Sequence, residues 1–94
     1  MFEDISVDQL KRMNSVDIID IRSKNKYERN HILNARNVLF DDLIFEPDKY
    51  ISKNKKTYIY CQSGNRSKIL CSILSKKGYD VCNILGGYQA WINI

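Results

Sequence analysis

One stretch decides how this chain folds and what it can do: Thr57-Tyr-Ile-Tyr-Cys61-Gln-Ser-Gly-Asn-Arg66-Ser67-Lys-Ile-Leu. It begins with a β-branched and aromatic run, which is typical of a strand, and the run ends abruptly at Cys61. A short polar loop follows, and then an apolar pattern with helical period begins. The stretch therefore predicts a strand, a cysteine at its carboxyl end, and a helix whose first turn faces the cysteine.

Such a junction favours a reactive cysteine. A helix N-terminus offers unpaired N–H groups and a partial positive charge, and both favour the thiolate, which is the nucleophilic form of cysteine. Gly64 allows the loop backbone to adopt a positive φ, so that successive amides can point inward around an anion. Arg66 adds a positive charge beside the sulfur. The alternative is a buried structural cysteine before an ordinary turn, and the glycine, arginine and serine that follow Cys61 favour the nucleophile.

The chain is long enough for one small domain, and we expect residues 1–94 to form it. The N-terminal residues lack the pattern of a secretory signal, and no apolar run is long enough to span a membrane. Three cysteines, an odd number in so short a chain, do not indicate a disulfide framework. We therefore expect a reducing, cytoplasmic setting.

The charge balance narrows the possible partners. The net charge is +4, from 15 Lys and Arg against 11 Asp and Glu, and the basic residues are scattered. No basic stripe with interleaved aromatic residues is present, which argues against nucleic-acid binding. A small anionic substrate or an acidic partner suits this balance better.

Along the chain, apolar runs typical of strands alternate with helical patterns. Ser6 and Gln9 can form a capping box at the start of a helix, and Gly78 is placed to end a later one, in which Ile69, Leu70, Ile73 and Leu74 form an apolar stripe. Asn30 is placed to end another helix, because asparagine tolerates the left-handed region. We expect strands at 16–22, 35–38, 57–60 and 81–85, and helices at 6–13, 24–29, 41–45, 47–51, 67–77 and 88–92. This alternation predicts an α/β fold with a parallel sheet.

Several polar residues outside the cysteine loop are candidates for a role. Asp20 and Arg22 lie two apart at the end of a buried strand, where α/β active sites form, although an ion pair that anchors a loop explains them as well. His31 could act as a base beside Cys61, but a structural imidazole that holds the following turn is favoured. Cys71 lies within a helix and is expected in the core, and Cys82 is a weak candidate for a resolving thiol.

Three separated segments resemble one family, the single-domain rhodaneses, which are thiosulfate sulfurtransferases. They are Ile18-Ile-Asp20-Ile-Arg22 with Tyr27, His31-Ile32 and Ala35; then Cys61-Gln-Ser-Gly-Asn-Arg66-Ser67; and Gly86-Gly87-Tyr-Gln-Ala90-Trp91. They span nearly the whole chain in the family's order. The middle turn departs from the family pattern, with Lys26, Asn30, Leu33 and Asn34 at positions where Glu, Gly and Pro-Gly are usual.

The resemblance implies a five-stranded, mostly parallel sheet with helices on both faces. It implies that Cys61 carries sulfane sulfur as a persulfide, and that the loop residues Gln62, Ser63, Gly64, Asn65, Arg66 and Ser67 bind the substrate and stabilise that persulfide. Asp20 and Arg22 would support the loop from beneath. No metal and no cofactor is implied. The donor would be a small anion such as thiosulfate, and the acceptor would be cyanide, a thiol, a thioredoxin-like protein or a sulfur carrier.

Three other functions remain open. Some phosphatases resemble rhodaneses in fold and also use a Cys–Arg loop, but theirs holds one residue more than the four between Cys61 and Arg66, so phosphatase and arsenate reductase activities are disfavoured. The domain could instead be a binding or regulatory module without turnover, a role often accompanied by loss of the cysteine, which this chain retains. It could also relay sulfur from a partner's persulfide by the same loop chemistry.

Overall fold

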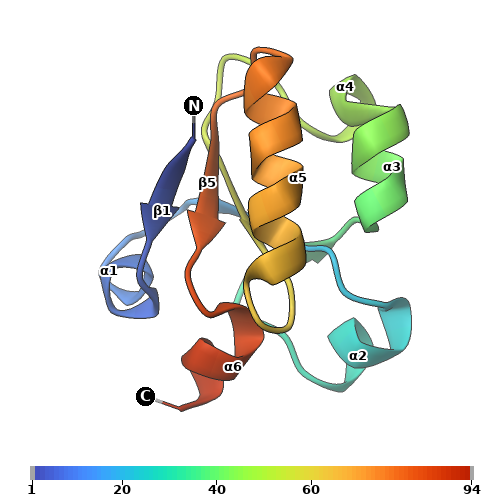
Figure 1. The fold of residues 1–94 in the computed structure, drawn as a ribbon. Helices are drawn as coiled ribbons and strands as arrows, with labels where there is room; N and C mark the ends of the chain where they lie inside the picture. Colours follow the sequence, from blue (N-terminus) through green and yellow to red (C-terminus); the bar gives the residue numbers. More distant parts are fainter. Residues whose placement is uncertain (1, 94) are drawn as a thin grey trace.

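The strand that ends at the cysteine, β4 (Thr57–Tyr60), lies at the centre of the sheet. The computed structural model describes residues 2–93 and contains a five-stranded sheet in the order β1-β5-β4-β2-β3 (Figure 1). The other strands are β1 (Glu3–Ile5), β2 (Asp17–Asp20), β3 (Arg36–Asn37) and β5 (Val81–Ile84). Every neighbouring pair is parallel, so the predicted sheet is confirmed and is fully rather than mostly parallel.

Helices cover both faces of the sheet, as predicted. On one face α5 (Asn65–Lys76) lies beside α3 (Phe40–Phe45) and α4 (Pro47–Tyr50), and Figure 1 shows α5 crossing in front of the strands. On the other face α1 (Val7–Lys11), α6 (Gly87–Ile92) and Tyr27 of α2 (Lys24–Arg29) pack on a second apolar cluster.

The strands supply both clusters because successive side chains point to opposite faces. Ile19 and Ile59 belong to the α5 cluster, whereas their neighbours Ile18 and Tyr58 belong to the α1–α6 cluster. All four are buried, as expected for parallel strands with both faces covered. Because all five strands are parallel, their carboxyl ends meet at one edge of the sheet, and Cys61 follows the central strand at that edge.

The local signals at the helix ends are largely confirmed. Ser6 and Gln9 form the predicted capping box at α1. Gly78 has φ +95° after α5, and the amides of Gly78 and Tyr79 bond back to the carbonyls of Ser75 and Leu74, which completes a Schellman motif. Pro47 opens α4, where its missing N–H and fixed φ are tolerated.

Four expectations need correction. The strand β1 was missed, because three residues at the end of the chain carry too little pattern. α5 begins at Asn65 rather than Ser67, since Gly64 serves as its N-cap. Ile69 is 56% exposed, so it does not belong to the buried stripe of α5. Asn30 ends α2 in an extended conformation, and the left-handed residue of this turn is Asn34, with φ +70°.

Candidate active site

The Cys61 sulfur sits where the N-cap side chain of α5 would normally sit. Its Sγ accepts the backbone N–H of Gly64 at 3.1 Å and that of Ser67 at 3.4 Å. Gly64 is the N-cap residue and Ser67 is the third helical residue, so the sulfur receives amides that an N-terminal helix turn leaves free. The arrangement that the sequence predicts, a cysteine facing the first turn of a helix, is therefore present.

These hydrogen bonds decide the acidity of the thiol. Burial alone would raise the pKa of Cys61, but the Ser67 hydroxyl and the backbone amides of Ser67, Gly64 and Ser63 outweigh it, and the pKa is lowered. The other two cysteines behave in the opposite way, because desolvation raises the pKa of Cys71 to about 12 and that of Cys82 to about 11. Cys61 is thus the thiol that ionises most readily of the three. Cys71 is a core residue, as expected.

The loop keeps its shape because α6 packs directly against it. The amide of Tyr88 donates to the Cys61 carbonyl at 2.9 Å, and the amide of Gln89 donates to the Gln62 carbonyl at 3.0 Å. Gly64, with φ +96°, comes so close to Gly86 that a β-carbon on it would lie 2.9 Å from the Gly86 nitrogen. The two glycine-containing turns therefore fit together only without side chains.

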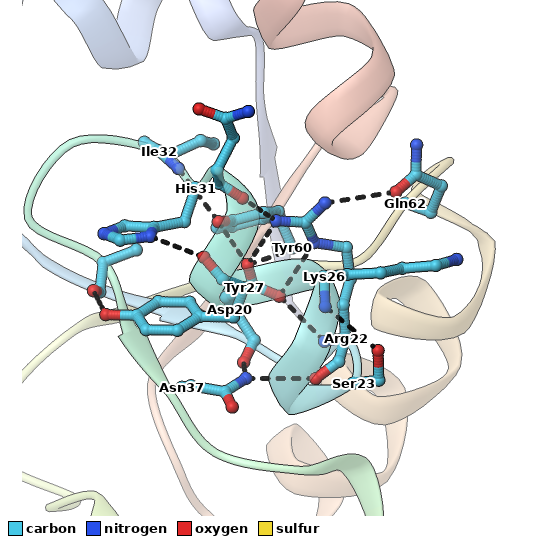
Figure 2. A network of polar contacts seen from close by, with 12 residues as sticks. Asp20, Arg22, Ser23, Lys26, Tyr27, His31, Ile32, Asn37, Tyr60 and Gln62 are labelled. Carbon is cyan, nitrogen blue, oxygen red and sulfur yellow. Dashed lines mark hydrogen bonds and ion pairs between the residues drawn. The ribbon is translucent and has the colours of Figure 1, made fainter.

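Asp20 and Arg22 form a buried ion pair beside the loop (Figure 2). The guanidinium bonds both carboxylate oxygens, with an Nη2–Oδ2 distance of 2.8 Å, and its Nη1 reaches the Gln62 Oε1 at 3.2 Å. Burial alone would lower the pKa of Arg22, but the Asp20 carboxylate holds it above its ordinary value. The pair thus links the end of β2 to the residue after the cysteine, which is the supporting position that the resemblance implies.

Tyr60 and Asn37 complete this network from the neighbouring strands. The Tyr60 hydroxyl donates to Asp20 Oδ2 at 2.6 Å and accepts the Ile32 amide at 3.0 Å. Burial, followed by the bond to Asp20, raises the pKa of Tyr60 well above its usual range. The Asn37 amide donates to the carbonyls of Asp20 and Arg22. Sequence reasoning missed both residues, although polar groups in apolar strands are a signal of such buried networks.

An open cavity of about 600 Å³ gives access to the sulfur. Its lining includes Cys61, Gln62 and Arg66 from the loop, together with Arg22, Lys26 and Phe40. The Arg66 side chain is exposed, and its guanidinium carbon lies 4.5 Å from the centre of the Phe40 ring, a cation–π contact. Three cations therefore line the cavity, although Asp41 and Asp42 of α3 also border it.

The remaining predicted site residues are placed less centrally. Ser63 on the loop and Asn65 at the start of α5 are both exposed, and of these two only Ser63 directs its backbone amide to the sulfur. The His31 Nδ1 lies 2.8 Å from the Tyr27 carbonyl, and its ring stacks on that of Tyr27, which supports the structural interpretation. Cys82 packs in the α1–α6 cluster, whereas Cys61 packs in the α5 cluster, so the structure disfavours Cys82 as a resolving thiol.

The structure of residues 2–93 also bears on metal binding and on membrane spanning. Across residues 2–93 no group of three or more His, Cys, Asp or Glu side chains is gathered closely enough to hold a metal ion. In the same part of the chain, no helix has the length and apolar character needed to cross a bilayer.

Comparison with known proteins agrees with this geometry. A model of the rhodanese-like domain matches residues 6–94. A rhodanese-like domain protein of Staphylococcus aureus has a solved structure that superimposes with a TM-score of 0.84 at 31% identity, over 96% of this chain and 91% of that one. The thiosulfate sulfurtransferase GlpE of Coxiella burnetii is 29% identical over 84 residues, which cover 88% of this chain and 78% of that enzyme.

Other relatives are longer than this chain. The uncharacterised protein YqhL of Bacillus subtilis is 36% identical over 75 residues, which cover 79% of this chain. The chain spans 59% of that protein's own length, and it spans 23% and 20% of the length of two further curated relatives. The family match over nearly the whole chain, together with the fold and the cysteine loop, shows that this protein belongs to the rhodanese-like domain family.

Proposed function

We propose that this protein is a sulfurtransferase that carries sulfane sulfur on Cys61 as a persulfide. The single observation that carries the proposal is the set of hydrogen bonds donated to Cys61 Sγ by the amides of Gly64 and Ser67. Donors aimed at one sulfur stabilise a negative charge there, and a thiolate is what attacks a sulfur donor.

In the proposed reaction the Cys61 thiolate attacks the outer sulfur of thiosulfate. The new bond joins Sγ to that sulfur, the sulfur–sulfur bond of thiosulfate breaks, and its electron pair leaves with sulfite. A nucleophilic acceptor such as cyanide then attacks the terminal sulfur of the persulfide. Thiocyanate leaves, and the Cys61 thiolate is regenerated. No cofactor is needed for either step, since each is a displacement at sulfur.

The residues around the loop have matching roles in this proposal. Arg66 and Lys26, which line the cavity beside Cys61, attract and orient the anionic donor. The amides of residues 62–67 hold the persulfide, and the Asp20–Arg22 pair fixes Gln62 and with it the loop backbone. The acceptor is a small nucleophile, a thiol, a thioredoxin-like protein or a sulfur carrier. A cytoplasmic location stays a prediction.

Hydrolysis of phosphate esters and reduction of arsenate both fit this loop less well. Only four residues separate Cys61 from Arg66, and the amides of Gly64 and Ser67 are both within 3.4 Å of the sulfur itself. A loop drawn this closely around one sulfur suits a persulfide better than a tetrahedral oxyanion bound above it. A binding module would use the same residues without turnover. A sulfur relay would use the same loop chemistry with a partner's persulfide as the donor.

Two parallel assays test the proposal. The purified protein is incubated with thiosulfate and cyanide, and thiocyanate is measured; a second sample receives a phosphate ester, and released phosphate is measured. We expect thiocyanate from the native protein and none above background from Cys61→Ser, with the buried-cysteine variant Cys82→Ala as a control that keeps activity. Phosphate release without thiocyanate would overturn the proposal, and the absence of both products would favour the binding module.

A further inference from the structure

A chain of hydrogen bonds leads from the surface to Cys61 through two fully buried polar residues. The Ser67 hydroxyl oxygen lies 3.4 Å from Cys61 Sγ and 2.6 Å from Asn83 Oδ1. Asn83 Nδ2 in turn lies 3.2 Å from Oδ1 of Asp4, which is exposed. Ser67 and Asn83 are 0% and 1% exposed, and a polar residue buried to this degree is retained only with its hydrogen bonds made.

The register of the sheet fixes which way the Asn83 amide faces. Asp4 of β1 lies opposite Asn83 of β5 in the parallel pair. An ionised carboxylate can only accept hydrogen bonds, so the Asn83 NH₂ group must face Asp4. The amide oxygen is then left facing Ser67. Asp4 therefore determines that Asn83 presents an acceptor, rather than a donor, to the serine hydroxyl.

That hydroxyl has one hydrogen and more than one acceptor within reach. Asn83 Oδ1 at 2.6 Å is closer than the Gly64 carbonyl at 3.2 Å or the Cys61 sulfur at 3.4 Å. While Cys61 is a thiol, the Ser67 hydrogen goes to Asn83 and the serine oxygen accepts from the S–H group. Once Cys61 has lost its proton, the thiolate attracts the same hydrogen, and the hydroxyl must turn away from Asn83 to donate to it.

We propose that Asn83 is a positioning residue, which holds the Ser67 hydroxyl hydrogen away from Cys61 and thereby opposes formation of the thiolate. Ser67 acts in the opposite sense, since its hydrogen stabilises the thiolate once turned. The inference concerns the nucleophile of the proposed reaction, but it describes ionisation of Cys61 and holds whether or not sulfur transfer follows. Asp4, at the surface, acts through the orientation of the Asn83 amide.

Other charged and titratable groups line the cavity beside Cys61 or lie near it in the core, and they stay constant in the test. They come from the end of β2, from α2, from α3 and from α5: Arg22, Lys26, Asp41, Asp42, Arg66 and Cys71. Asn83→Val replaces one neutral side chain by another, so it leaves these charges in place. Valine also suits a buried strand and fills most of the space of the asparagine.

The test measures the alkylation rate of Cys61 by iodoacetamide against pH, with the site followed by mass spectrometry. Asn83→Val is expected to lower the apparent pKa of Cys61 by about half a unit to one unit, the scale of one neutral hydrogen bond. Ser67→Ala is expected to raise it by a similar amount. In the Ser67→Ala background, Asn83→Val should have no further effect. A residue with only a structural role would not lower the pKa of Cys61 in the native background and leave it unchanged once the Ser67 hydroxyl is absent.

An unchanged or raised pKa in Asn83→Val, or an equal shift with and without Ser67, would overturn the inference. If Asn83→Val does not fold, Asp4→Asn at the surface decides instead. An amide at position 4 can accept or donate, so the Asn83 amide is no longer held in one orientation. A lowered Cys61 pKa that shrinks in the Ser67→Ala background supports the inference, and an equal shift in both backgrounds, the effect of charge alone, contradicts it.

Discussion

A β-carbon placed on Gly87 would lie 2.3 Å from the carbonyl oxygen of Cys61, so the first residue of α6 and the cysteine are packed backbone to backbone. The next amide, that of Tyr88, donates to the same carbonyl at 2.9 Å. The glycine pair is therefore the surface on which the cysteine loop rests, rather than a simple turn between β5 and α6.

Gly87→Ala should therefore destabilise the protein and displace the loop. Gly87 has φ +58°, and a β-carbon in this region costs about 1–2 kcal/mol even without a clash. Gly78→Ala is the matched control, because Gly78 also has a positive φ but its nearest neighbour is the flexible Lys53 side chain at 3.7 Å. Urea unfolding should show Gly87→Ala to be less stable than Gly78→Ala by about 2 kcal/mol. Equal losses would mean that the close approach to Cys61 is unimportant.

Arg22→Met should be among the most destabilising single changes. It leaves the Asp20 carboxylate, which is 0% exposed, without its cation, and breaking a buried pair in this way costs about 3–5 kcal/mol. Arg36→Met is the comparison, since Arg36 pairs with Asp17 and its side chain is 42% exposed. That change should cost about 1 kcal/mol or less. Chemical denaturation of both variants measures the difference, and similar losses would argue against the buried pair as the support of the loop.

The three cysteines should differ sharply in reactivity. The pKa of Cys61 is lowered, whereas burial raises that of Cys71 to about 12 and that of Cys82 to about 11. In native protein, iodoacetamide should modify Cys61 alone, with an inflection below the value of about 8.5 that is usual for a free cysteine. Peptide mapping checks the site, and a denatured sample should be modified at all three. Modification of Cys82 at the rate of Cys61 would contradict this account.

The same shifts predict that stability falls in alkaline solution. In the unfolded protein the thiols lose their protons near pH 8.5, which is about the usual pKa of cysteine. In the folded protein Cys71 keeps its proton up to about pH 12 and Cys82 up to about pH 11. Between these limits the unfolded state binds fewer protons, so the free energy of unfolding decreases as pH rises. Cys61 has the opposite sign, because its pKa is lowered, and its stabilising contribution grows as pH rises toward about 8.5 and is constant above that value. Urea unfolding on both sides of about pH 8.5 should show the decrease, and Cys82→Ala should reduce its slope.

Arg66→Met should slow formation of the persulfide from an anionic donor. Arg66 lines the cavity with Cys61, and its guanidinium is placed by the Phe40 ring. We expect a loss of about tenfold in rate with thiosulfate, and a smaller loss at high salt, where charge attraction is screened. Lys68→Met, an exposed change on the same helix, removes the same charge outside the cavity lining and should have little effect. Equal losses in the two variants would assign the effect to net charge instead.

Much of this molecule could be predicted from local sequence patterns. The β-branched and aromatic run before Cys61 predicted a strand, Gly64 predicted a positive φ, and the apolar run after the loop predicted a helix; all three are present. The capping box at Ser6 and the helix end at Gly78 were equally clear, because each depends on residues close together in the chain.

What escaped prediction depends on contacts between distant segments. β1 has only three residues and is defined by its pairing with β5, nearly eighty positions along the chain. Asn83 looked like an ordinary residue of an apolar strand, and its role appears only when Ser67 and Asp4 are brought to either side of it. Ile69 fits the apolar period of α5 but lies where the helix meets solvent, since no element within residues 2–93 covers that position.

The central claim, that Cys61 carries the transferred sulfur, is tested most directly by the intact mass of the protein. The native protein is treated with thiosulfate, desalted and measured, beside Cys61→Ser and Cys82→Ala. We predict a gain of one sulfur atom in the native protein and in Cys82→Ala, no gain in Cys61→Ser, and loss of the added mass after cyanide is supplied. A native protein that gains no sulfur, or a Cys61→Ser variant that gains it equally, would contradict the account.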